Sequence, residues 1–279
     1  MSPIAAPAPG ALLDDTSVAW ATAARWWAVL GGQRALLLQV AHPEVAAAVA
    51  EHSDWEARSL HRLVSTLTAM LRLSFGSASA AHAQAESLGR VHGSIVGRTA
   101  DDVAYDATDP DAQAWVLATL IDSLWEVERR FVGRLTETDR DRSVVETRLL
   151  AQSFNIDLDE FPIDAAGFRR WFGERAEALE PDDRSRSSAR SILDPPLRWV
   201  PGSAKRFGAV LACDLLPPVV RERLELPAAR PHEVARILAW QRRGRRTIPR
   251  LPPTLTLNPL VPWSLREPAG QPRRSRPTR

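Results

Sequence analysis

The chain has 279 residues, of which 44% are hydrophobic and 25% are charged, so it is long enough to bury a large core and is typical of a soluble globular protein. Its single cysteine, Cys213, excludes internal disulfides, a cysteine-rich zinc module, an iron–sulfur cluster held by four of its own thiolates, and a CxxCH attachment site. The net charge is +2, but residues 242–279 hold ten arginines and one glutamate, so this segment carries +9 and the preceding residues carry −7.

The two ends of the chain differ in composition from the middle. Residues 1–15 are rich in proline and alanine, and residues 249–279 contain eight of the 22 prolines, so we expect both segments to be extended and without helices. We therefore divide the sequence into a flexible N-terminal arm, a folded domain over 16–246 and a Pro/Arg-rich tail over 247–279.

The hydropathy pattern predicts no membrane-spanning segment. The most hydrophobic stretch, residues 20–40, is interrupted by Arg25 and Arg34, and the opening residues lack the basic start and apolar block of a secretory signal. We therefore expect a cytoplasmic protein. The basic tail suggests contact with an anionic membrane surface as one interpretation and an ordinary solvated run of charge as the other. Because the tail has no nucleic-acid motif and no interleaved aromatic residues, we expect no nucleic-acid partner.

Apolar residues recur at helical spacing along most of the middle segment, whereas alternating strand patterns are nearly absent. Asp109, Thr136 and Asp164 provide helix start signals, and Pro43 should kink or divide the second helix. The helix at 112–131 is apolar around more than half of its circumference, which is typical of a central helix. The sequence thus predicts an all-α single domain with helices at 20–30, 35–49, 60–73, 78–91, 112–131, 144–154, 165–179, 204–216 and 234–240.

Three polar residues should gather at one end of a helical hairpin that turns at Gly76. Arg62 lies fourteen residues before this glycine, Thr66 ten before it, and His92 sixteen after it. At about 1.5 Å per residue, Arg62 and His92 should lie within roughly one helical turn of the same level, with Thr66 nearer the bend. Arg62 and Thr66 border an apolar face, so they could supply the few oriented hydrogen bonds that a mostly apolar pocket makes to its ligand. A capping or salt-bridge role is the alternative.

His92 has Gly89 and Gly93 as neighbours, which leaves space for a flat, bulky ligand to approach the helix. Its imidazole could ligate haem iron, and a purely structural histidine is the alternative. Cys213 is a second candidate ligand, or else a small hydrophobic residue of the core. His42 directly precedes the kink at Pro43. We expect it to form a hydrogen bond with backbone carbonyl oxygens that the kink leaves without a helical partner, or else to line a pocket. Haem needs only one ligating side chain and an apolar slot, whereas the sequence has no zinc, GxSxG, P-loop or GxGxxG motif.

Five short blocks occur in order along the first half of the sequence. Together they resemble the catalytic domain of rubber oxygenases (latex clearing proteins) and of fungal MpaB-type oxygenases. The segments FP at 161–162 and LPPVVR at 216–221 extend the likeness over most of the predicted domain. The five blocks are GGQRALLLQVAHP at 31–43, RLVST at 62–66, FG at 75–76, VHGSIVG at 91–97, and YDATDP at 105–110 followed by WV at 115–116.

This resemblance implies an all-α, globin-like protein that binds haem b, with His92 as the proximal iron ligand and Arg62 and Thr66 at the haem pocket. Members of the family add dioxygen across an isoprenoid carbon–carbon double bond and cleave it. The resemblance therefore implies a haem-dependent oxygenase that uses O₂ and acts on a small hydrophobic, isoprenoid-like substrate; a non-catalytic haem or lipid carrier or sensor is the alternative. Ser65 stands where rubber oxygenases have a lysine that can cap the distal side of the iron, so we assign no distal cap.

Overall fold

The structure is a computed structural model that describes residues 8, 10–52, 55–154, 156–196, 200–258, 261 and 265, with the side chains of residues 52 and 55–64 outside the description. Helices dominate, and the only strands in these ranges form one small antiparallel hairpin. The elements are α1 (Val18–Ala23), η1 (Trp26–Gly31), α2 (Gly32–Val40), α3 (Pro43–His52), α4 (Trp55–Phe75), α5 (Ala78–His92), β1 (Val96–Arg98), β2 (Ala104–Asp106), α6 (Pro110–Val127), η2 (Glu128–Val132), α7 (Glu137–Ala151), α8 (Ala165–Ala178), α9 (Asp183–Leu193), α10 (Gly202–Leu215), α11 (Pro218–Arg223), α12 (Pro231–Thr247), η3 (Ile248–Arg250) and α13 (Pro253–Thr256).

The all-α prediction is confirmed, and the predicted start signals act as helix caps. The Asp109 carboxylate accepts the N–H groups of Asp111 and Ala112, both at 2.9 Å, and so satisfies donors that the first turn of α6 leaves free. Thr136 and Asp164 cap α7 and α8 in the same way. As expected, the chain is divided before Pro43, with α2 ending at Val40 and α3 beginning at the proline. The charged helix α9, the short α11 and the β1–β2 hairpin were not predicted.

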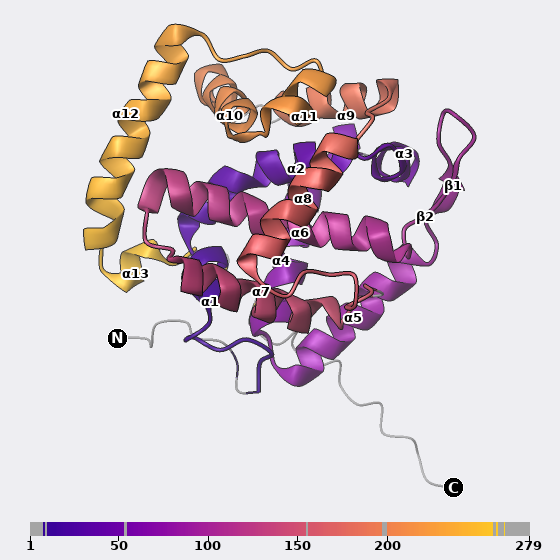
Figure 1. Cartoon of the computed structure of the whole chain (residues 1–279), viewed down its shortest axis with the longest axis horizontal. Coiled ribbons are helices and arrows are strands. Elements are labelled where there is room, and N and C mark those ends of the chain that lie inside the picture. Colours follow the sequence, from indigo (N-terminus) through magenta and orange to yellow (C-terminus); the bar gives the residue numbers. More distant parts are fainter. Residues whose placement is uncertain are drawn as a thin grey trace, which may run out of the picture.

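Helix α6 crosses the middle of the molecule between α2 and α8 (Figure 1). Nine of its eighteen residues are buried. The Trp115 ring stacks on Phe172 of α8 with 5.2 Å between centroids, and its indole N–H donates to the Leu38 carbonyl oxygen at 3.0 Å. Burial of Trp115 therefore removes a large apolar area from water while its indole N–H keeps a partner. The prediction that this helix forms the centre of the core is therefore confirmed.

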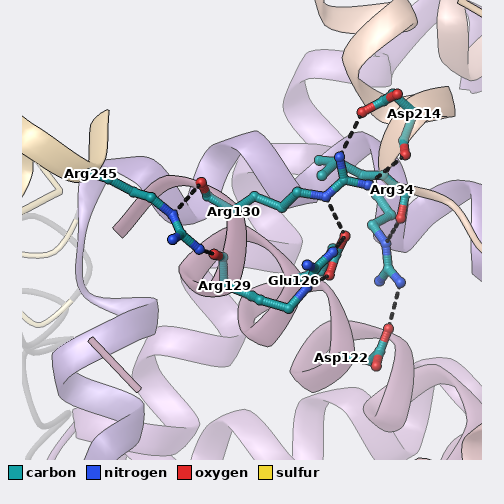
Figure 2. Close-up of polar contacts among 8 residues, drawn as sticks. Arg34, Asp122, Glu126, Arg129, Arg130, Asp214 and Arg245 are labelled. Atoms are coloured by element: carbon teal, nitrogen blue, oxygen red, sulfur yellow. Dashed lines mark hydrogen bonds and ion pairs between the residues drawn. The ribbon is translucent and has the colours of Figure 1, made fainter. Parts of the chain in front are cut away.

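A network of charged side chains joins α6 to α2 and α10 (Figure 2). The Arg34 guanidinium, only 3% of whose residue surface is exposed, donates to the Leu215 carbonyl oxygen at 2.7 Å and the Ser123 hydroxyl at 2.8 Å, and pairs with Asp122 at 2.5 Å. Burial raises the pKa of Asp122 against the opposing attraction of Arg34. At the outer edge of the network, Arg130 bridges a carboxylate of α6 and one of α10.

Helix α6 continues into a single π-helical turn, η2, which ends at Gly133 in the left-handed region with φ 75°. The first residue of this turn, Glu128, is 3% exposed and accepts the indole N–H of Trp27 at 2.7 Å. Burial raises the pKa of Glu128 to about 7, although the Trp27 hydrogen bond and the charges of Arg134 and Arg25 oppose the increase. The folded protein therefore holds a carboxyl group that takes up its proton near neutral pH.

The segment after residue 247 differs from the extended tail that was expected. It forms η3 and α13, each with a proline in its first turn, where the missing N–H has no helical partner to lose. The backbone N–H of Asn258 then donates to the Ala24 carbonyl oxygen at 2.8 Å, and the Thr256 hydroxyl accepts a bond from Arg25 at 3.1 Å. The first part of the tail thus packs on the folded body. Within the described residues, no helix has the length and hydrophobicity needed to traverse a bilayer.

We predict that Arg34→Met lowers the free energy of unfolding by about 3 kcal/mol, because it leaves the Asp122 carboxylate without its buried partner. Urea unfolding at neutral pH measures the change. The matched control is Arg129→Met, which removes the ion pair between Arg129 and Glu126. Because the Arg129 side chain is 56% exposed, this variant should lower the free energy of unfolding by less than about 1 kcal/mol. Equal losses in the two variants would contradict a special role for Arg34.

We predict that Glu128→Gln stabilises the protein at pH 8 but not at pH 4.5. The pKa of Glu128 is raised from 4.5 to about 7 in the folded state, so as the pH rises this carboxyl group loses its proton in the unfolded chain before it does so in the folded chain. The free energy of unfolding therefore falls as the pH rises from about 4.5 to about 7. Glutamine keeps an acceptor for Trp27 and removes this loss, which has an upper limit of about 3 kcal/mol. Urea midpoints of both proteins across this range test the prediction, and parallel pH profiles would refute it.

Candidate functional site

The predicted helical hairpin is present and consists of α4 and α5. The Gly76 N–H donates to the Arg72 carbonyl oxygen at 3.0 Å, and a Cβ atom at position 76 would lie 2.5 Å from that oxygen, so only glycine fits this turn. Ser77 then caps α5 by accepting the Ala80 N–H at 3.3 Å. The FG block of the sequence is therefore the point at which the chain reverses.

The three predicted site residues lie on this hairpin, Arg62 and Thr66 on α4 and His92 at the end of α5. Counted from the turn at about 1.5 Å per residue, Arg62 and His92 differ in level by about 3 Å and Thr66 and His92 by about 9 Å. The side chain of Arg62 lies outside the described part of the structure. Thr66 is exposed, whereas the apolar arc of α4 was expected to reach it. Thr68, which the sequence did not single out, is the buried threonine of this helix.

The imidazole of His92 is half-buried, and burial lowers its pKa below the ordinary 6.5. At pH 7 the ring is therefore neutral, and a neutral nitrogen is the form that binds a metal. No described residue forms a hydrogen bond or ion pair with this ring. The backbone around it is fixed, since the carbonyl oxygen of His92 accepts the Ile95 N–H at 2.9 Å and Gly93 caps the helix.

Helix α5 is covered incompletely along its length. None of its fifteen residues is buried, although Ala, Leu and Val make up much of the helix. A Cβ atom at Gly89, one turn before His92, would touch no heavy atom within 4 Å. Val91, Val96 and Val103, close to His92 in sequence, are each about half exposed, at 52%, 56% and 51%. An exposed apolar surface of this kind is typical of a binding surface.

The surroundings of His92 fit a side chain that would hold haem iron in three respects. The ring is neutral, its nitrogens have no partner among the described residues, and the helix that carries it presents uncovered apolar surface. In addition, the hydroxyl of Thr68 on the adjacent helix is buried without a partner in the described part of the chain. The described ranges contain no cluster of three or more His, Cys, Asp or Glu side chains that could hold a metal. Haem needs only one such side chain and an apolar slot.

The β1–β2 hairpin follows His92 directly and anchors that end of α5. Tyr105 of β2 donates its hydroxyl to Glu51 of α3 at 2.6 Å, and Arg184 of α9 pairs with the other oxygen of Glu51 at 2.6 Å. A Cβ atom at Gly97 would lie 2.4 Å from the Tyr105 hydroxyl, so this position requires glycine. Burial and Glu51 raise the pKa of Tyr105 to about 12, and the phenol remains a donor at neutral pH. Sequence patterns missed this anchor because its strands have only three residues each.

The other two candidates from the sequence lie elsewhere. Cys213 is 3% exposed in the core, and burial raises the pKa of its thiol to about 11, which disfavours the thiolate that a metal would bind. The surroundings thus favour the small hydrophobic role for Cys213. His42 lies at the α2–α3 junction, where burial lowers its pKa and its Nδ1 has no partner among the described residues. The expected hydrogen bond from His42 to a freed backbone carbonyl oxygen is not observed among the described residues.

Two cavities lie at opposite ends of α6. One, of 260 Å³, is lined by acidic residues that include Asp109 and Glu160, together with Trp171 and Arg175. The other, of 280 Å³, is lined by Glu128 and its neighbours. Neither cavity is lined by His92 or Thr66. The Arg175 guanidinium lies 4.3 Å from the centroid of the Trp171 ring and pairs with Asp111 at 2.5 Å. The acidic lining of the first cavity is therefore already paired with a positively charged side chain of the protein.

Comparison with known protein families matches residues 20–249 to a family described as the catalytic domain of ER-bound oxygenase mpaB/B′ and rubber oxygenase. This match covers most of the chain and includes α4, α5 and the β1–β2 hairpin. The comparisons with curated proteins and with solved structures give no match. Because the matched range extends from α1 through α12, the chain belongs to the mpaB and rubber oxygenase catalytic-domain family of oxygenases.

Proposed function

We propose that the protein is a haem-b-dependent oxygenase that uses O₂ to attack or cleave a carbon–carbon double bond in a small hydrophobic, isoprenoid-like substrate. The observation that carries the proposal is the neutral imidazole of His92, without a partner among the described residues, at the end of a helix that presents uncovered apolar surface. The family match supports oxygenase chemistry.

In this proposal His92 would hold the haem iron through its imidazole, and the haem would supply the binding and activation of dioxygen. The low pKa of His92 keeps its nitrogen available without a proton to displace at neutral pH. The Ile95 N–H and the β1–β2 hairpin fix the backbone on which the imidazole is mounted. The ring would therefore keep a constant position when the pocket is filled.

Arg62 and Thr66 would form the polar border of the same pocket. Arg62 lies nearly level with His92 along the hairpin. An arginine at the border of the pocket would supply positive charge that stabilises negative charge developing on oxygen. Thr66 would contribute a hydroxyl one turn nearer the bend. The apolar surface of α5 would exclude water from an alkene substrate and bind it by burial of hydrocarbon. Ser65 is too short and too weak a ligand to take the place of a lysine, so we assign it no role in capping the iron.

We predict that the full-length protein binds hemin with about one iron per chain and shows a Soret band, and that His92→Ala loses most of this absorbance. The matched control is His82→Ala, which changes a histidine on the same helix whose side chain is 77% exposed and should leave binding unchanged. Added imidazole should restore part of the spectrum of His92→Ala if the helix still folds. Equal hemin binding by His92→Ala and the wild type would exclude His92 as the ligand.

We predict that Arg62→Ala lowers oxygen-dependent turnover of an unsaturated isoprenoid by roughly 10- to 100-fold while haem content stays at the wild-type level, because the variant removes charge stabilisation and leaves the ligand in place. Thr66→Val should produce a smaller loss. Oxygen consumption and product analysis across a panel of short isoprenoids measure the effect.

The same panel tests the proposed function itself. Iron without turnover of any alkene would contradict the oxygenase proposal and favour a haem carrier or sensor. A wild-type chain that takes up no hemin would contradict the haem proposal and leave a lipid-binding role.

A further inference from the structure

Helix α12 lies along one edge of the molecule, with α13 at its end (Figure 1). Its inner face packs on η2 through Ile237 and Gln241, which are buried. At Gly244 the two backbones approach so closely that a Cβ atom would lie 2.8 Å from the Phe131 carbonyl oxygen. The inner face of α12 is therefore committed to the fold, and its outer face is left for solvent or a partner.

The outer face of α12 carries positive charge that the described residues do not neutralise. Residues 230–250 contain seven arginines and a single acid, Glu233, and that acid pairs with Arg206 at 2.9 Å. Arg242, Arg243 and Arg246 are exposed, and their guanidinium groups have no ion-pair partner in the described ranges. At about 100° per residue, all three point away from the buried arc of the helix.

Arginines elsewhere on the described surface are often matched to carboxylates. Arg140 and Arg169 both pair with Glu137, and Arg184 pairs with Glu51. On α12 itself, Arg245 is the exception among the neighbouring arginines, because it donates to the carbonyl oxygens of Arg129 and Arg130 (Figure 2). Three arginines without a carboxylate partner among the described residues thus gather on one face of one helix.

Large apolar side chains lie beside this charge. Leu238 and Trp240 on α12 are 44% and 47% exposed, and Leu251 and Leu255 just after it are 37% and 64% exposed. One such residue alone is ordinary on a protein surface. Four of them within eighteen residues, interleaved with arginines, match the composition of segments that lie in the interface of an anionic membrane.

We propose that the outer face of α12, together with Leu251 and Leu255, docks on an anionic lipid bilayer. The arginines would meet lipid phosphates, and the exposed Leu and Trp side chains would enter the boundary between headgroups and acyl chains. Charge complementarity selects this partner and also an orientation, because the residues before 242 carry −7 and would be repelled by the same surface. A protein surface that binds nucleic acid presents open aromatic faces on which bases stack. The Trp240 ring instead contacts Phe207 at 4.9 Å between centroids, and only the 47% of its surface that stays exposed is free to reach lipid.

The test is co-sedimentation of the full chain with phosphatidylcholine vesicles that contain about 30% phosphatidylglycerol or none. The wild type should bind only the anionic vesicles, and about 0.5 M NaCl should weaken the binding. Arg242→Glu combined with Arg246→Glu should lower the partition coefficient by at least about 20-fold, since each basic residue near such a surface contributes roughly fivefold. Leu255→Ser should reduce the binding that remains at high salt.

The matched control is Arg170→Glu combined with Arg190→Glu, which alters two exposed arginines of α8 and α9 by the same total charge. This pair should change binding by less than about threefold. Equal losses of vesicle binding in the two double variants would assign the effect to net charge and overturn the proposal. Full binding by the α12 double variant would also overturn it, because the contact would then lie in the arginines beyond residue 258. Tighter binding of polyuridylate than of anionic vesicles at the same salt would also overturn it. Circular dichroism confirms that each variant is folded, and none of these outcomes depends on haem binding or turnover.

Discussion

The candidate site depends on one constraint, the exposure of apolar surface along α5 next to the neutral imidazole of His92. A helix of fifteen residues with none buried forgoes most of the packing that stabilises a helix in a protein. The chain nevertheless holds this helix in place from both ends, with the Gly76 turn on one side and the Tyr105–Glu51 contact on the other. The arrangement favours a ligand that covers the face of α5, and burial of the apolar surface would then contribute to its affinity.

The rest of the fold is well packed and provides a rigid support for that hairpin. Helix α6 buries half of its residues between α2 and α8, and the Arg34 network ties it to α2 and α10 with hydrogen bonds for every guanidinium nitrogen. Ion pairs of this kind contribute little net stability compared with apolar packing, but breaking one of them leaves a buried charge. The contrast between a tightly packed centre and an incompletely covered α5 is what locates the candidate site.

Local signals in the sequence predicted a large part of the fold. Asp109, Thr136 and Asp164 are caps that act within three residues, so a linear pattern is enough to find them. Helix α9 escaped prediction because it buries only Ser185, Ala189 and Ile192, which is too thin an apolar stripe to recognise. The helix predicted over residues 20–30 proved to be α1 and η1, separated by a short break.

The site was predicted in outline from the counting of residues around Gly76 and from the resemblance of short blocks to known oxygenases. Its chemistry required the tertiary structure. The neutrality of His92 follows from burial, and the requirement for Gly97 follows from the position of Tyr105, neither of which a periodic pattern contains. In the same way, the contact between Trp27 and Glu128 joins residues 101 positions apart, and only the folded chain brings them together.

A carbon monoxide difference spectrum of the dithionite-reduced, hemin-loaded protein tests the central claim most directly, because it separates ligation by imidazole from ligation by a thiolate. Ligation by His92 predicts a Soret band of the imidazole-ligated type. A band of the thiolate type would move the ligand to Cys213, and a chain that stays colourless with hemin would contradict the account altogether.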